Sequence, residues 1–191
     1  MKQVREVRPV GIDDAWRFNV IHVTGLTSLS ISVICCVIVL LFIARDAKIG
    51  SVRAFFARPV GERLLVYLAL CNLLYNLSHI MDHAYMLAVR GNPPDATCAA
   101  FGFFLNQFVV AQALIVTFTA VNAFVMVVKK TKVTLGRYDW KLFVVSLGVP
   151  LVCGTLLAAT RHLGPSGMWS VSTVFALVIS NSQQLICVLY G

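Results

Sequence analysis

Charged side chains are scarce in this sequence. Asp, Glu, Lys and Arg make up 13% of the 191 residues, whereas 59% are hydrophobic, and the mean hydropathy is +0.83. Soluble globular domains carry about 25% charged residues, so this composition excludes an ordinary soluble domain. It is typical of a polytopic membrane protein, and the first partner that it predicts is the lipid bilayer.

Acidic residues and paired cysteine motifs are also few. Eight acidic residues stand against sixteen basic ones, and the six cysteines form no C-x-x-C motif. The spacing of the cysteines argues against a zinc site or a disulfide framework. The basic residues lie in short segments between apolar runs and are not interleaved with exposed aromatics, which argues against nucleic-acid binding. We therefore expect no nucleic-acid partner, no metal and no other cofactor.

Five apolar runs are each long enough to cross a bilayer as a helix. They cover about residues 20–44, 64–88, 98–128, 142–160 and 169–190, after a mixed-charge tail at 1–19. The first run is rich in β-branched residues, which would favour strands in water, but its length favours a spanning helix in lipid. The predicted fold is all-α: a polytopic transmembrane bundle of five spans, covering residues 20–191.

The third run is the one around which we expect the bundle to be organised. As a helix, residues 96–128 extend about 50 Å, against about 30 Å of hydrocarbon, so this helix must tilt or project beyond the lipid. It also carries four amides, which should turn toward other helices because lipid offers them no partner. These amides are Asn106, Gln107, Gln112 and Asn122.

Pro150 predicts a kink in the fourth run, because proline leaves a backbone carbonyl without its helical donor. Gly154, four residues beyond it, and Ala158 have the small-xxx-small spacing that allows close helix packing in membranes.

The basic residues predict an orientation. Two linkers hold five Lys or Arg residues each: Arg45, Lys48, Arg53, Arg58 and Arg63 in the first, and Lys129, Lys130, Lys132, Arg137 and Lys141 in the second. The opposite side has Arg90, Arg161 and the four in the tail. Because cytoplasmic loops are enriched in Lys and Arg, we expect both linkers in the cytosol and the N-terminus outside, in the plasma membrane.

Several short motifs between residues 64 and 169 follow one another in a characteristic order. The order and spacing of these motifs resemble those of the cyclic-AMP-receptor-like G-protein-coupled receptors, known from slime moulds, fungi and invertebrates. The resemblance implies the first five helices of a seven-helix receptor, not an enzyme, that binds an extracellular ligand and activates a heterotrimeric G protein. The motifs are LALCNLL (68–74), Cys98, Gly102, Gln107-Phe108, Asn122 with the basic run after it, GRYDWKL (136–142), Pro150 and GPSGMW (164–169).

The chain departs from that family at three points. Asn72 stands where many such receptors have an acidic residue, and Ser170 where they have a cysteine paired with the one atop the third helix. The fifth run ends at Gly191 without a basic anchor. No sixth helix follows it, and in such receptors the sixth helix moves to open the G-protein cavity. A truncated, non-signalling form that associates with a full-length receptor is therefore the alternative.

Three ionisable residues cluster near the outer end of the second run. His79, Asp82 and His83 share one helical face, and an ionisable group within a span is a functional hypothesis by default. Matched outer ends of neighbouring antiparallel helices would place Gln107 at the depth of His79, with Phe103 and Phe104 near Asp82. The predicted ligand-binding residues are His79, Asp82, His83, Phe103, Asn106 and Gln107. The predicted G-protein-facing residues are Arg53, Arg58, Lys129, Lys130 and Arg137.

Less specific interpretations of these residues stay open. Asp82 and His83 could sit at the headgroup level, where we also expect His22. His-x-x-Asp-His could begin the metal site of a membrane hydrolase, which would need a third ligand such as His162. The Gly-Pro-Ser-Gly segment at 164–167 echoes intramembrane serine proteases, but it lies in a polar loop and is interpreted as a turn. We predict no catalytic residues.

The charge count gives a testable topology. A tag at residue 1 is expected to bind antibody on intact cells, whereas a tag near Gly136 should bind only after permeabilisation, because Gly136 lies in a basic linker. The reverse pattern would contradict the orientation.

Overall fold

The computed structural model describes residues 14–46, 52–90, 94–131 and 135–159, and this part of the chain contains helices but no strand. The all-α prediction is therefore confirmed for these residues. The helices are α1 (Ala15–Asp46), α2 (Val52–Phe56), α3 (Val60–Val89), α4 (Asp95–Val128), η1 (Arg137–Asp139), α5 (Trp140–Phe143), η2 (Val144–Gly148) and α6 (Val149–Ala159).

Four helical stretches of the described residues are long and apolar enough to cross a membrane. They are Ala15–Arg45, Val60–Val89, Asp95–Val128 and Arg137–Ala159. Each contains one of the first four predicted runs, apart from one or two residues at its end, so the chain is a multi-pass membrane protein. The predicted fifth span and most of the predicted N-terminal tail lie outside the described residues, as do His162, the segment 164–169 and Ser170.

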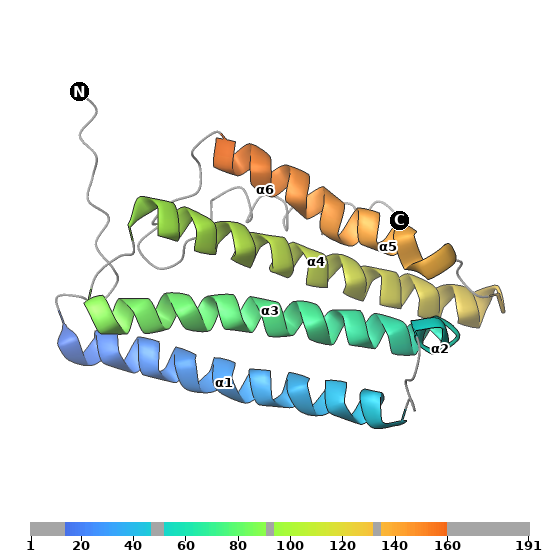
Figure 1. The fold of residues 1–191 in the computed structure, drawn as a ribbon, viewed down its shortest axis with the longest axis horizontal. Helices are drawn as coiled ribbons and strands as arrows, with labels where there is room; N and C mark the ends of the chain where they lie inside the picture. The colour runs from blue at the N-terminus through green and yellow to red at the C-terminus, as the bar shows by residue number, and fades with distance from the viewer. Residues whose placement is uncertain (1–13, 47–51, 91–93, 132–134, 160–191) are drawn as a thin grey trace.

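The long helices lie side by side in the order α1, α3, α4 and α6 (Figure 1). α1 packs on α3, α3 on α4, and α4 on η2 and α6. In its apolar window α3 is 33% buried, against 17% for α4 and 6% for α1. The predicted central position of the helix at 98–128 is shared by α3, because each of these two helices packs on a neighbour at either side.

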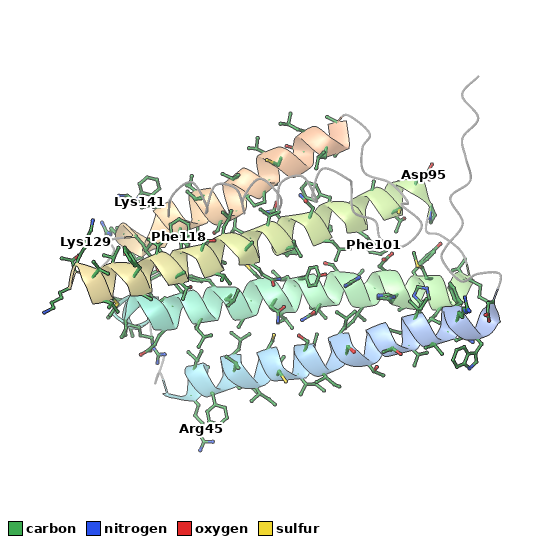
Figure 2. All side chains as sticks on the ribbon, turned by 180° about the vertical axis from the view of Figure 1, so that it is seen from behind. Arg45, Asp95, Phe101, Phe118, Lys129 and Lys141 are labelled. Atoms are coloured by element: carbon green, nitrogen blue, oxygen red, sulfur yellow. The ribbon has the colours of Figure 1, made fainter. Side chains whose placement is uncertain are left out.

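Basic side chains gather at one end of this row. Figure 2 shows Arg45, Lys129 and Lys141 at the same end of the helices, with Asp95 at the other. The two basic linkers thus lie on one side of the bundle, as alternating antiparallel spans require. This agrees with the alternation of loops from which the orientation was predicted.

The amides of α4 face other helices, as predicted. Asn106, Gln107 and Asn122 are buried, and Gln112 is half-buried. The Gln107 side chain donates a hydrogen bond to the Leu147 carbonyl at 2.9 Å, and that of Gln112 donates to the Cys71 carbonyl at 3.4 Å. A polar group in hydrocarbon needs such a partner, which is why these faces of α4 point to η2 and to α3.

The predicted kink at Pro150 takes the form of a π-helical turn, η2, directly before α6. Proline has no N–H to donate back along the helix, and a π turn is one way for a helix to absorb that loss. The Leu147 carbonyl of this turn accepts the Gln107 amide from α4. The hydroxyl of Ser146 donates to the Leu142 carbonyl at 2.7 Å. The π turn therefore also forms a hydrogen-bonded contact between the fourth span and α4.

Gly154 marks the closest approach of α6 to α4. A Cβ built on Gly154 would lie 2.9 Å from Cε2 of Phe103, whereas one on Gly148 would meet nothing within 4 Å. Ala158 is exposed, so only the glycine of the predicted small-xxx-small pair lies in the contact. Gly154 thus determines how near the two helices can come.

We expect Gly154→Val to destabilise the protein by about 1–3 kcal/mol, because the new side chain forces α6 away from Phe103. Gly148→Val, the same substitution six residues earlier in open space, is expected to cost much less. Reversible unfolding in lipid discs would compare the two variants. Equal losses would contradict the close approach at Gly154.

Candidate functional site

The interface between α1 and α3 is a polar seam with heptad spacing. Both helices place residues on it at alternating steps of three and four, the spacing of left-handed coiled-coil packing. The described contacts join antiparallel positions in one register, from His22 with His83 to Cys36 with Asn72. The seam positions are Phe18, His22, Gly25, Leu29, Ser32 and Cys36 of α1, and Ala69, Asn72, Asn76, His79, His83 and Met86 of α3.

In its middle the seam is held by amide and hydroxyl groups. The Asn76 amide donates to the Ser32 hydroxyl at 2.8 Å, and the Asn72 amide lies 3.4 Å from the same oxygen. Asn72 also donates to the Cys36 sulfur at 3.0 Å. Asn72, where the resembling family often has an acid, is therefore a joint between α1 and α3. Such interhelical bonds contribute about 0.6 kcal/mol each on average in a membrane.

At the outer end the seam becomes a histidine cluster. Nδ1 of His22 lies 2.7 Å from Nδ1 of His83, and the ring of His79 is centred 4.8 Å from that of His83. Phe18 packs on His22 at 4.3 Å between ring centres, and Gly25 leaves room for the His83 ring. The exposed fractions are 5% for His22, 4% for His79 and 9% for His83. α3 therefore covers His22, while its expected depth at the headgroup level stays a prediction.

Asp82 lies beside this cluster but on another side of α3. It is about three turns from Cys71 along the same face, and Cys71 packs against Ala111 and Ile115 of α4. Only 3% of Asp82 is exposed, and no donor among the described residues lies within hydrogen-bond distance of its Oδ1. A buried carboxyl oxygen without a donor in a span is costly and marks a place where a ligand or a proton can act.

Three of the predicted ligand-binding residues contact the fourth span. Phe103 and Asn106 lie against Gly154 of α6, and Gln107 donates to the Leu147 carbonyl of η2. Phe104 is 47% exposed. One outward-opening pocket that these residues form with Asp82 stays a prediction. Matched helix ends fix the depth of a residue but not the side of the helix on which it lies.

A buried ion pair at the basic end was not predicted. Asp139 is 1% exposed, and its Oδ2 and Oδ1 lie 2.9 Å from Nε and Nη2 of Arg63. The Tyr67 hydroxyl donates to the same carboxylate at 2.9 Å. Arg63 also donates to the carbonyls of Phe56 and Arg58. The Asp139 carboxylate therefore connects the start of the fourth span to the start of α3. Through Arg63 it also holds the segment between α2 and α3.

The backbone before α5 is shaped to present this carboxylate. Gly136 has φ 83°, and Tyr138 and Asp139 follow with φ 59° and 55°, in the left-handed region that L-residues rarely adopt. Two such residues in sequence persist only where contacts hold them. The sequence signal was Asp139 itself, the only acidic residue in a basic linker.

The predicted G-protein-facing residues are solvent-accessible at the same end. Arg53, Lys129, Lys130 and Arg137 are exposed, and the Arg137 guanidinium lies 5.1 Å from the ring centre of Tyr138. Arg58 is half-buried and forms an ion pair of 3.3 Å with Glu62. Within the described residues, no group of three or more His, Cys, Asp or Glu side chains is placed to hold a metal ion.

We expect Asp139→Asn to destabilise the protein by about 3–5 kcal/mol, because it leaves Arg63 buried without its counter-charge. Asparagine tolerates the left-handed backbone, so the loss would report the charge and not the turn. Tyr67→Phe should cost about 1.5–3 kcal/mol, one hydrogen bond to a charged group.

Glu62→Gln is the matched control, since it makes the same chemical change in the half-exposed pair with Arg58 and should cost at most about 1 kcal/mol. Unfolding free energies in lipid discs measure all three. A loss for Asp139→Asn no larger than that for Glu62→Gln would contradict the buried ion pair.

Comparison with known proteins adds no family to this geometry. No family model matches the chain, and no curated protein matches it. What the bundle does is therefore inferred from its own residues.

Proposed function

We propose that this multi-pass membrane protein is a receptor-like bundle that senses an extracellular ligand and couples to a heterotrimeric G protein. The observation that carries the proposal is a group of four ionisable side chains near one end of the bundle, each more than nine-tenths buried: the histidine cluster of His22, His79 and His83, and Asp82 beside it. Ionisable groups are expensive inside a membrane and are typical of ligand, ion or proton sites.

The charge distribution supports the orientation that this function needs. The basic residues at the end of Arg45, Lys129 and Lys141 favour the cytosolic side (Figure 2). In the plasma membrane that orientation places the N-terminus outside the cell and the cluster near the extracellular end of the helices. His22 is then about 10 Å from the outer end of α1, seven residues after Ala15. A small extracellular ligand could reach that depth.

The motifs that resemble the cyclic-AMP-receptor-like receptors support the proposal in a second way. Asn72 joins α3 to α1, Gln107 joins α4 to η2, and Asp139 joins the start of the fourth span to α3. Gly102 and Pro150 are buried as well. These motif residues therefore hold the bundle together. Contacts between helices are the role that such motifs would have if the chain shares the receptor architecture.

The basic end supports coupling to a cytosolic partner. Exposed Lys129, Lys130 and Arg137 present positive charge beside the ion-paired corner of Arg63 and Asp139. Positive surface charge favours encounter with a partner that carries negative charge there. A heterotrimeric G protein docking at this face would contact both linkers. Any movement of the Arg63–Asp139 ion pair would then change that contact.

A binding experiment tests this coupling. The chain in lipid discs, which expose both faces, would be titrated with purified GDP-bound heterotrimers of each Gα class. We expect one class to bind, and Lys129→Gln with Lys130→Gln to weaken that binding by about tenfold, because two contacting charges are lost.

Arg17→Gln with Arg90→Gln is the control for this experiment. It removes the same charge at the other end of the helices and should leave the affinity within about twofold. Absence of binding by every class would overturn the coupling. Equal losses in the two double variants would overturn the assignment of the docking face.

A further inference from the structure

The outer end of the α1–α3 seam has the geometry of a proton-binding site. His22 and His83 approach through the same ring atom, Nδ1 to Nδ1, at 2.7 Å, and both are buried. We propose that the extracellular ligand sensed by this bundle is the proton, taken up by the His22–His83 pair, and that a second bound proton separates the outer end of α1 from α3. This inference rests on the proposed function for its outward orientation and names the ligand of that site.

The hydrogen atoms on the pair explain why the response should be a switch. With both rings neutral, one ring donates its Nδ1–H to the bare Nδ1 of the other, so the contact is satisfied. One added proton goes to the bare outer Nε2 of the donor ring, and the bond between the rings is kept. A second added proton puts N–H groups on both facing atoms. The rings then repel each other as donors and as charges, and the contact cannot persist.

The surroundings of the pair decide whether two positive charges can be tolerated. α3 contributes His79, whose ring is centred 4.8 Å from that of His83 and would carry the same sign if protonated. Asp82 is the nearby acidic side chain, but it lies on the side of α3 that faces α4. The other titratable or charged side chains at this end are Asp14 just before α1, Arg17 of α1, Tyr75 and Tyr85 of α3, Arg90 just after α3, and Asp95 and Cys98 of α4.

The seam is built so that such a separation would stay local. Below the histidines, Asn76 and Asn72 bind Ser32 and Cys36 through neutral groups, which do not change between pH 5 and 8. α1 packs mainly on α3, and its apolar window is 6% buried. The outer turns of α1 can therefore swing outward while the lower seam keeps α1 attached.

Histidine NMR on the otherwise native chain in lipid discs tests the site directly. With ¹⁵N-labelled histidine, we expect His22 and His83 to titrate as a coupled pair, in two separate steps, between pH 8 and 5. Two independent single-step titrations would overturn the shared site. His22→Phe should convert the His83 titration into a single step, and an unchanged His83 curve would also overturn it.

Distance measurements test the movement. Spin labels at Trp16→Cys and Val89→Cys, both exposed positions at the outer ends of α1 and α3, would be compared at pH 7.5 and 5.0 on a cysteine-depleted chain. We expect the distance to lengthen by about 2 Å or more, the scale of helix shifts in switching proteins. Labels at Leu41→Cys and Leu65→Cys, toward the inner end of the same helices, should keep their distance.

Two variants separate protonation from packing. His22→Phe should abolish the lengthening, because Phe cannot take a proton, while Phe18→Leu, one turn away on the same seam, should retain it. Lengthening in His22→Phe, or none in the parent chain, would overturn the switch. These outcomes do not depend on G-protein binding, so the switch and the proposed coupling can fail separately. Loss of folding in the cysteine-depleted chain leaves the NMR titration to decide.

Discussion

A polar side chain in hydrocarbon has to find its partner on another helix, and this requirement accounts for how the helices of this protein are joined. Asn72 and Asn76 pair with Ser32 across the α1–α3 seam, Gln107 reaches a carbonyl of the π turn, and Asp139 is held by Arg63 and Tyr67. Lipid is as apolar as leucine, so apolar contacts alone would not select one arrangement of the helices. The few polar groups select one arrangement, because rotating or shifting a helix would leave its polar side chain without a hydrogen-bond partner in hydrocarbon, at a large cost in free energy.

The same requirement separates the bundle into two regions with different properties. At the basic end a fully paired carboxylate and a strained turn fix the start of the fourth span on α3. At the other end the histidines face one another, and their contact depends on how many protons they hold. With the Arg63–Asp139 ion pair fixed at one end and a proton-dependent histidine contact at the other, a change in external pH would move the outer ends of the helices while the bundle stays assembled. Because α3 carries both joints, it is the helix through which the two ends would communicate.

Length and charge were sufficient to predict the helices, since a span of hydrocarbon dictates both how long a run must be and where the basic residues gather. The amides of α4 were also predictable as inward-facing, because lipid gives them no alternative. The partner of each polar group was not predictable, because depth follows from counting residues whereas the facing side depends on which helices are neighbours. Thus Phe103 and Gln107 were assigned to the side of Asp82 but lie toward α6 and η2. His22 was judged by its distance from the membrane surface, although its heptad relation to Ser32 and Cys36 was a usable signal of burial.

The π turn before α6 has a consequence for how this sequence can tolerate insertions and deletions. A π turn holds about one residue more than the α-helical turn that it replaces. Deletion of a single residue between Val144 and Gly148 would remove the π turn and leave a regular helix, in which Val149–Ala159 keep the faces that they present to α4. Gly154 would then stay against Phe103, whereas a one-residue deletion inside α6 would rotate the residues after it by about 100°. The π turn is thus the place in the fourth span where the chain can lose one residue and keep its packing on α4.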